Sequence, residues 1–140
     1  MRIEGNAFLV TGGGSGLGAA TADWIAGQGG RVAVLDRNAG AARAVADRMG
    51  GLAVCADVTD EAQVMAALEA AEAAQGPLRG LVMCAGIGGG ARVLGRDGPQ
   101  PLAQFQAILR VNLLGSFNVL APGCRTDAGR SGEGRGARGG

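Results

Sequence analysis

A glycine-rich segment follows the first apolar run of the chain, and its residue types suit the binding of a phosphate group. The run at 7–10 leads into Thr11-Gly12-Gly13-Gly14-Ser15-Gly16-Leu17-Gly18. A phosphate-binding turn needs glycines where the backbone takes a positive φ or lies against the ligand, and a helix that then presents free N–H groups. The predicted cofactor-binding residues of this turn are Gly12, Gly14, Ser15, Gly16, Leu17 and Gly18.

An acidic residue ends the next apolar run, where a dinucleotide-binding unit needs one. Asp36 follows the run at 32–35. A carboxylate there accepts hydrogen bonds from the ribose hydroxyls of the adenosine half and repels a 2′-phosphate, which favours NAD over NADP. Arg37 supports the NADP alternative, because its guanidinium group can pair with a 2′-phosphate. Taken alone, Asp36 could also be a helix cap or a turn residue ahead of Asn38.

Short apolar runs alternate with longer alanine-rich segments from residue 7 to about residue 120, which is typical of strands joined by crossover helices. The runs are apolar on both faces, as in a covered parallel sheet. The pattern predicts strands at 7–11, 31–36, 51–56 and 80–85, and helices at 16–28, 39–49, 61–75 and about 102–120. The fold class is therefore α/β, a Rossmann-type doubly wound parallel sheet represented by its first four strands and ending after the fourth helix.

The helical spacing of apolar residues indicates which faces point to the core. One face of the first helix carries Leu17, Ala20, Trp24 and Ile25, the second carries Ala42, Val45, Ala46 and Met49, and the third carries Val64, Leu68 and Ala71. Asp60 is the predicted N-cap of the third helix, with Gln63 three residues on as in a capping box. The fourth helix carries a stripe of Leu102, Phe105, Leu109, Leu113, Phe117 and Leu120.

Composition excludes several classes of function. The 47% of hydrophobic residues suits a packed interior, while a net charge of +1 and 3% of aromatic residues argue against nucleic-acid binding. We expect no membrane association and a cytoplasmic location, because no signal-peptide pattern and no apolar stretch of ~20 residues is evident. Cys55, Cys84 and Cys124 are expected to be reduced thiols, and no metal site is expected in a chain without histidine.

The composition changes after Leu120, which predicts a boundary between a domain at 1–120 and a tail at 121–140. The tail is rich in Gly and Arg and has no large apolar residue, so it is expected to be disordered. An RNA-binding segment is one alternative, although Asp127 and Glu133 offset its arginines. Out-of-frame translation is another, and it would explain why an amphipathic helix stops in mid-pattern.

These residues together resemble the short-chain dehydrogenase/reductase family. Thr11 through Gly18 match its T-G-x-x-x-G-x-G pattern, and Asp57-Val58 match its D-V pair near the adenine. Cys84-Ala85-Gly86 corresponds to its N-N-A-G turn, with Met83 and Cys84 in place of the two asparagines. Asn112 matches a helix asparagine that, in the family, helps to hold a catalytic lysine and a proton-relay water. The resemblance covers residues 7 to about 120 and looks most like the type-2 3-hydroxyacyl-CoA dehydrogenases.

The resemblance implies an NAD-dependent oxidoreductase that transfers a hydride between a secondary alcohol, such as a 3-hydroxyacyl-CoA, and NAD. It also implies that full-length relatives are homo-oligomers. The family's catalytic tyrosine and lysine have no counterpart, because the chain contains no Tyr and all of its basic residues are Arg. We therefore expect a catalytic half lost by truncation or frameshift, no turnover, and poor solubility. The alternatives are a non-catalytic NAD- or nucleotide-binding module and an assembly fragment that docks through an unpaired strand edge.

Overall fold

A four-stranded parallel sheet forms the centre of the molecule. The computed structural model describes residues 2–96 and 98–128. The sheet contains β1 (Ala7–Thr11), β2 (Arg31–Asp36), β3 (Leu52–Cys55) and β4 (Leu78–Met83), in the order β3-β2-β1-β4. The chain moves outward from β1 to β3 and then crosses back to place β4 on the other side of β1. This reversal is the doubly wound α/β arrangement that the sequence predicts.

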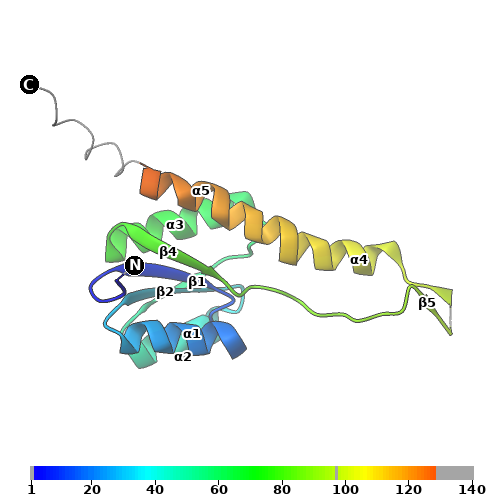
Figure 1. Cartoon of the computed structure of the whole chain (residues 1–140), viewed down its shortest axis with the longest axis horizontal. Helices are drawn as coiled ribbons and strands as arrows, with labels where there is room; N and C mark the ends of the chain where they lie inside the picture. Colours follow the sequence, from blue (N-terminus) through cyan, green and yellow to red (C-terminus); the bar gives the residue numbers. More distant parts are fainter. Residues whose placement is uncertain (1, 97, 129–140) are drawn as a thin grey trace, which may run out of the picture.

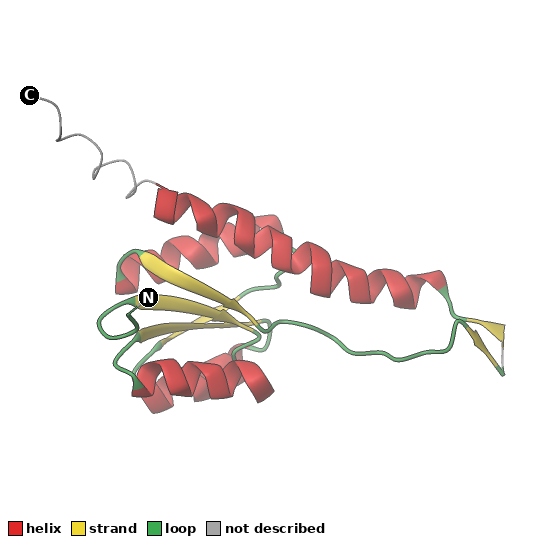
Figure 2. Ribbon diagram, viewed as in Figure 1, coloured by secondary structure: helices red, strands yellow, loops and turns green. Residues whose placement is uncertain are grey.

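Helices cover both faces of the sheet (Figures 1 and 2). Helices α1 (Gly16–Gly27) and α2 (Ala39–Met49) lie on one face, and α3 (Glu61–Gln75) and α5 (Ser116–Ala128) lie on the other. Successive strand side chains point to opposite faces. In β1, Phe8 and Val10 therefore join the core under α1 and α2, while Leu9 joins the core under α3 and α5. All five β1 residues are buried, so this strand lies at the centre of both cores.

The predicted fourth helix is a longer and less regular run than expected. It consists of α4 (Leu102–Leu109), a π-helical segment η1 (Arg110–Gly115), and α5. The prediction that the domain ends at Leu120 is wrong, because the helix continues through Pro122 to Ala128. Val119 is fully buried, and Gly123 lies so close to Leu81 of β4 that a methyl group on it would collide. This contact holds the helix against the sheet beyond residue 120. The disorder predicted for 129–140 lies outside the described residues.

The apolar faces of two helices are less buried than their spacing suggests. Leu17 is 83% exposed and Trp24 is 58% exposed, whereas Ile25 of the same predicted face is buried, together with Gly18 and Ala22. The glycine-rich turn sets this rotation, because Gly18 packs against the backbone of Gly12. The α4–η1–α5 stripe faces outward, with exposures of 40–68% for Leu102, Phe105, Leu109, Leu113, Phe117 and Leu120. Small residues face the protein in its place.

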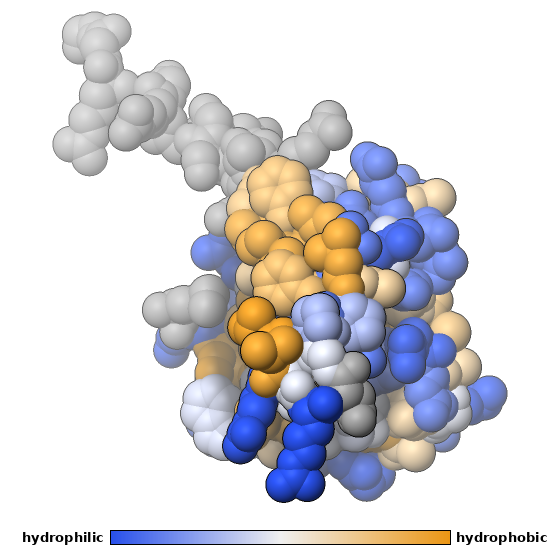
Figure 3. Space-filling model, turned by 90° about the vertical axis from the view of Figure 1, so that its right-hand side faces the viewer, coloured by the Kyte–Doolittle hydropathy of each residue, from blue (hydrophilic) through white to orange (hydrophobic). Residues whose placement is uncertain are grey.

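The outward stripe forms a hydrophobic surface, part of which is visible where orange side chains gather in Figure 3. The run Leu102–Cys124 has 23 residues, a mean hydropathy of 1.2 and 17% of its window buried, which is enough in length and composition to cross a membrane. The expectation that no segment reaches this length is therefore wrong, because the run contains too few charged and strongly polar residues to lower its mean hydropathy further. Its amphipathic pattern is equally that of a helix on the surface of a soluble fold.

Smaller differences concern strand ends and one loop. Strand β4 begins at Leu78 and ends at Met83, whereas 80–85 was predicted. The N–H of Cys84 still donates to the carbonyl oxygen of Thr11 (3.1 Å), which is the last residue of the partner strand β1. Strand β3 and helix α1 are shorter than predicted by one or two residues. The glycine-rich loop after β4 contains a short antiparallel pair, β5 (Leu94–Gly95) with β6 (Gly98–Pro99).

Candidate cofactor site

A cavity of about 400 Å³ opens at the carboxyl ends of the central strands. This is the edge where the strand order reverses between β1 and β4, and open α/β sheets bind ligands at such a switch point. All of the predicted cofactor-binding residues except Gly14 line it: Gly12, Ser15, Gly16, Leu17, Gly18, Asp36, Arg37, Asp57, Val58, Cys84, Ala85 and Gly86. The structure therefore brings together residues from four separate segments of the chain.

Each glycine in the turn after β1 is needed, or tolerated, for a different structural reason. Gly12 has a φ of 62°, and a Cβ there would lie 2.7 Å from the Ala85 Cα. A Cβ on Gly18 would collide with the backbone of Gly12. Gly16 has a φ of 52° but open space where a Cβ would stand. The turn is thus packed on its protein side and open at Gly16, which fits a backbone that receives a ligand.

The start of α1 is suited to an anion. Ser15 is its N-cap in extended conformation, but its side chain makes no capping hydrogen bond, and the first turn contains no acidic residue. The first N–H groups of a helix have no partner within the helix and carry a partial positive charge. Because these groups adjoin the cavity, the pyrophosphate of a dinucleotide fits here.

Asp36 lies at the end of β2 with both carboxylate oxygens engaged by backbone. Oδ2 accepts from the Gly14 N–H (3.0 Å), and Oδ1 accepts from the Asn38 N–H (2.9 Å). The second bond is the turn contact that the alternative interpretation of Asp36 requires, but the cap of α2 is Asn38, whose Oδ1 accepts from the Ala41 N–H (3.0 Å). Asp36 therefore makes a turn and also lines the cavity. Its carboxylate enters the site already oriented.

Asp57 is the second carboxylate at the cavity, and its pKa is lowered. The main cause is the hydrogen bond from the Thr59 N–H to Oδ1 (2.9 Å), followed by that from the Thr59 hydroxyl (2.8 Å). Burial opposes these two bonds by raising the pKa, and the positive charges of Arg37 and Arg110 lower it by smaller amounts. The field of Arg37 thus acts on Asp57, although Arg37 was predicted to act at the ribose.

The start of α3 fixes the backbone of Asp57. Asp60 caps this helix as predicted, because its Oδ1 accepts from the Gln63 N–H (3.0 Å). The Gln63 side chain does not return to the cap residue's N–H as in a standard capping box. Its Oε1 accepts from the Asp57 N–H (3.0 Å), and its Nε2 donates to Asp60 Oδ2 (3.1 Å). The cap therefore also holds the loop that carries the carboxylate.

The turn after β4 is held by β1. The Thr11 hydroxyl, which is 1% exposed, accepts from the Ala85 N–H (3.2 Å). This bond fastens Cys84-Ala85-Gly86 without the side-chain amides that the family's asparagines would supply. The backbone of Ala85 lies directly against Gly12, so the β1 and β4 turns form one wall of the cavity.

Asn112 reaches the same wall from η1. Its Oδ1 accepts from the Ile87 N–H (2.8 Å) and its Nδ2 donates to the Ile87 carbonyl oxygen (3.0 Å). The side-chain amide is thereby used on both sides to hold the loop after Gly86. The role that the resemblance gives Asn112, holding a lysine and a water, stays a prediction.

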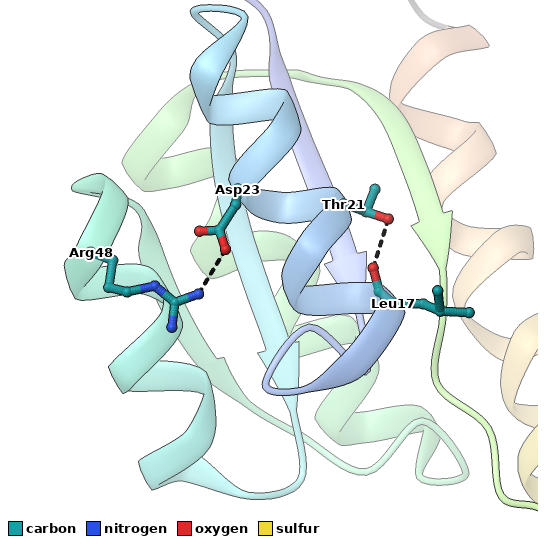
Figure 4. Close-up of polar contacts among 4 residues, drawn as sticks. All are labelled: Leu17, Thr21, Asp23 and Arg48. Atoms are coloured by element: carbon teal, nitrogen blue, oxygen red, sulfur yellow. Dashed lines mark hydrogen bonds and ion pairs between the residues drawn. The ribbon is translucent and has the colours of Figure 1, made fainter.

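Helix α1 is fixed on its outer side by polar contacts (Figure 4). The Thr21 hydroxyl donates to the Leu17 carbonyl oxygen (2.7 Å), and Asp23 pairs with Arg48 of α2 (2.7 Å). The ion pair is exposed, so it contributes little to stability. The Leu17 side chain projects away from the helix at the rim of the cavity.

Sequence reasoning missed four apolar residues that line the cavity, namely Leu35, Ala56, Ile87 and Val111. Each is adjacent in sequence to a residue that was predicted, and this adjacency is the signal that could have found them. The described residues hold no cluster of three or more His, Cys, Asp or Glu side chains suited to a metal ion.

Comparisons with known proteins show what the chain is similar to. A family model described as short chain dehydrogenase matches residues 6–133. The human 3-hydroxyacyl-CoA dehydrogenase type-2 is 37% identical over 99% of this chain and 53% of its own length. The ipsdienol dehydrogenase of Ips pini is 39% identical over 85% of this chain and 47% of its own. The chain spans about half the length of these curated relatives.

Among solved structures, the chain resembles the 3-ketoacyl-(acyl-carrier-protein) reductase of Brucella melitensis complexed with NADH. The TM-score is 0.83 and the sequence identity is 35%, over 93% of this chain and 54% of that one. The likeness covers the sheet and its helices in a single alignment.

Proposed function

The chain belongs to the short-chain dehydrogenase family, and from this premise we propose that its cavity binds NAD. The observation that carries the proposal is the cavity itself, where the glycine-rich turn, the start of α1 and the Asp36 carboxylate meet. The three features match the three parts of an adenine dinucleotide that need different chemistry: a backbone-lined turn, an anion site and an acceptor for the ribose hydroxyls.

NAD is favoured over NADP because of charge at the ribose. Asp36 presents a carboxylate at the end of β2, and a 2′-phosphate placed beside it would be repelled. Arg37 is the competing feature, because it lines the same cavity beside Asp36 and can pair with a 2′-phosphate. The related reductase complexed with NADH supports a nicotinamide cofactor without deciding between the two forms.

For a longer polypeptide that also contains the part of the relatives' length that this chain does not span, we propose hydride transfer between a secondary alcohol and NAD. NAD supplies the hydride acceptor when bound, and the residues described here bind and orient it. The substrate we propose is a 3-hydroxyacyl-CoA, on the basis of the human relative. The ipsdienol dehydrogenase shows that relatives of similar identity differ in the alcohol that they are named for.

The 140-residue chain itself is proposed to be catalytically inactive. The family's reaction needs a tyrosine and a lysine that remove the hydroxyl proton, and this chain contains no Tyr and no Lys. A binding assay and an activity assay together test the proposal. NADH should bind the purified chain, as seen by calorimetry, while incubation with NAD and a 3-hydroxyacyl-CoA should produce no NADH. Failure to bind NADH contradicts the proposal for the site, and turnover contradicts the proposal for the chain.

A second candidate function is that of a nucleotide-binding module without chemistry. The same sequence favours it, because all but one of the predicted cofactor-binding residues line the cavity whereas the chain contains neither Tyr nor Lys. Competition with ADP-ribose discriminates the two. A module that recognises the adenosine half should bind ADP-ribose about as tightly as NADH, whereas a site adapted to hydride transfer should bind NADH more tightly.

A further inference from the structure

We propose that Asn118 is a positioning residue for the adenine end of the NAD site, and that it acts through the backbone of Val58. Asn118 belongs to α5, and its Nδ2 donates to the Val58 carbonyl oxygen (2.8 Å). Val58 is buried and lines the cavity, whereas Asn118 is not among the lining residues. The inference rests on the proposed function of the cavity, and it gives a role at the site to a residue outside its wall.

The order of the strands places the base of the dinucleotide at the loop after β3. The pyrophosphate is proposed to lie at the start of α1, after β1, and the ribose of the adenosine half beside Asp36, after β2. Strand β3 is the next neighbour of β2, and the loop that follows it brings Asp57 and Val58 to the same cavity. A ligand that extends from the turn after β1 past the end of β2 therefore reaches these two residues with its adenine.

The carboxylate of Asp57 offers an acceptor that distinguishes one base from another. Both hydrogen bonds from Thr59 fall on Oδ1, at 2.9 Å and 2.8 Å, and neither falls on Oδ2. An ionised carboxylate oxygen can only accept, so Oδ2 suits the exocyclic amino group of adenine. Hypoxanthine has a carbonyl oxygen in place of that amino group, and the carboxylate would repel it. The preference for adenine over hypoxanthine therefore reports where the Asp57 carboxylate lies.

The loop after β3 is held from two helices. Gln63 of α3 accepts from the Asp57 N–H through its Oε1 (3.0 Å), and Asn118 of α5 donates to the carbonyl oxygen of the next residue, Val58. Two bonds on consecutive residues fix the backbone between them, and with it the direction in which the Asp57 side chain leaves the loop. The bond from Asn118 is partly buried, whereas the bond to Gln63 is exposed. Water therefore replaces Asn118 less readily as a partner of the loop.

The test compares the dissociation constants of NADH and of reduced nicotinamide hypoxanthine dinucleotide by calorimetry. The wild-type chain should bind the hypoxanthine form about tenfold more weakly, the size of one hydrogen bond to a charged group. In Asn118→Ala this preference should fall about fivefold, the size of one ordinary hydrogen bond. Ser116→Ala is the control, because Ser116 donates only within the same helical run, to the Asn112 carbonyl oxygen (2.7 Å), and it should leave the preference unchanged. A general loosening of the fold would weaken both ligands equally, and an unaltered preference in Asn118→Ala would overturn the inference.

Two further variants keep the test decisive if Asn118→Ala does not fold. Asn118→Ser has a hydroxyl that is one bond shorter than the amide, so it should reduce the preference to the same extent. Gln63→Ala removes the other bond to the loop at an exposed site and should reduce the preference as well. In an Asp57→Ala background, neither change at Asn118 should alter the preference further, and a further change would overturn the inference.

The same titrations separate the inference from the proposed function on which it rests. If the wild-type chain does not bind NADH, the proposed function fails. NADH binding without a preference for adenine, or with a preference that survives in the folded Asn118 variants, contradicts the inference alone.

Discussion

At the scale of single residues, the site is organised by backbone N–H groups that hold side chains in place. Asp36 accepts from Gly14 and Asn38, Asp57 accepts from Thr59, and Thr11 accepts from Ala85. Such bonds orient the acceptors before a ligand arrives, which lowers the cost of ordering them on binding. The site is therefore expected to respond to changes in these partners.

The lowered pKa of Asp57 predicts a dependence of stability on pH. Because the folded state favours the ionised form, Asp57 contributes stability above its ordinary pKa of 3.8, and that contribution is lost as the pH falls through the lowered value. Asp57→Asn should therefore lose less stability on acidification than the wild type. Urea unfolding followed by circular dichroism, from about pH 7 to about pH 2, measures this difference.

Thr59→Val provides the matched variant for Asp57. It removes the hydroxyl bond to Oδ1 but leaves the bond from the Thr59 N–H. Its acid dependence should lie between those of the wild type and Asp57→Asn. Equal slopes for all three proteins would show that Thr59 does not hold the carboxylate in its ionised form.

The bridge from Asn112 predicts a measurable loss of stability. Asn112→Ala removes both hydrogen bonds to Ile87 and leaves two backbone groups without these partners. The bonds are exposed, so the loss is expected to be about 0.5–1.5 kcal/mol, the net contribution of an ordinary hydrogen bond. Asn112→Asp places a carboxylate oxygen where Nδ2 donates to the Ile87 carbonyl oxygen, so it should cost at least as much. Urea unfolding gives the free energies, and an Asn112→Ala chain as stable as wild type would contradict the role of the bridge.

Sequence motifs predicted which residues lie at the cavity but not what each of them contacts. Motif spacing identifies the turn, the acid and the carboxyl ends of strands, and these converge because parallel strands end on the same side. It carries no information on hydrogen-bond partners. The contact of Gly14 with Asp36, the reach of Gln63 to Asp57 and the field of Arg37 at Asp57 all depend on the folded backbone, so they appear only in the structure.

At the scale of elements, the run α4–η1–α5 packs on the protein through small residues. Gly115 ends η1, and a Cβ there would lie 2.6 Å from the Cγ2 of Val58, a residue of the cavity wall. Because Gly115 has no side chain, the π-helical segment can lie directly against Val58 at the cavity wall. Helix position and cavity shape are therefore coupled.

This coupling predicts that Gly115→Ala destabilises the chain by about 1–3 kcal/mol, the usual cost of overpacking. Adding Val58→Ala should restore part of the loss, because it removes the methyl groups that the new side chain meets. Gly90→Ala is the control, since nothing lies within 4 Å of its added Cβ. Thermal unfolding measures all three. If Val58→Ala and Gly115→Ala have additive effects, the two sites are not in contact and the argument is wrong.

The strands of the sheet and the helices that pack on it could be predicted well, whereas the run α4–η1–α5 could not. The segments at 7–11, 31–36, 39–49 and 61–75 have the predicted bounds, because each is apolar on the face or faces that the fold buries. The stripe of α4–η1–α5 predicted a helix by its period alone. Periodicity shows that a helix has an apolar face, but it does not tell which other surface covers that face.

At the scale of the whole molecule, two apolar features remain exposed. Strand β4 pairs with β1 on one side only among the described strands, and the stripe on α4–η1–α5 faces outward. Unpaired strand edges and contiguous apolar surfaces both promote association. The purified chain is therefore expected to associate or to be poorly soluble.

Light scattering over a concentration series tests this expectation. Leu113→Arg and Phe117→Arg place charges on side chains that are 60% and 67% exposed, so they should raise solubility without lowering the melting temperature. Gln106→Arg adds the same charge at an exposed residue outside the stripe and should have a smaller effect. A wild-type chain that stays monomeric and melts sharply and reversibly would show that these surfaces do not drive association.

The proposed NAD site is the cavity between the turns after β1, β2 and β4. A titration of isotope-labelled chain with NAD, followed by backbone amide NMR signals, measures binding at this site. We expect saturable shifts in Gly12, Gly16, Asp36 and Ala85 with little change on the outer faces of α3 and α5. No saturable shift, or shifts confined to a surface away from these residues, would contradict it.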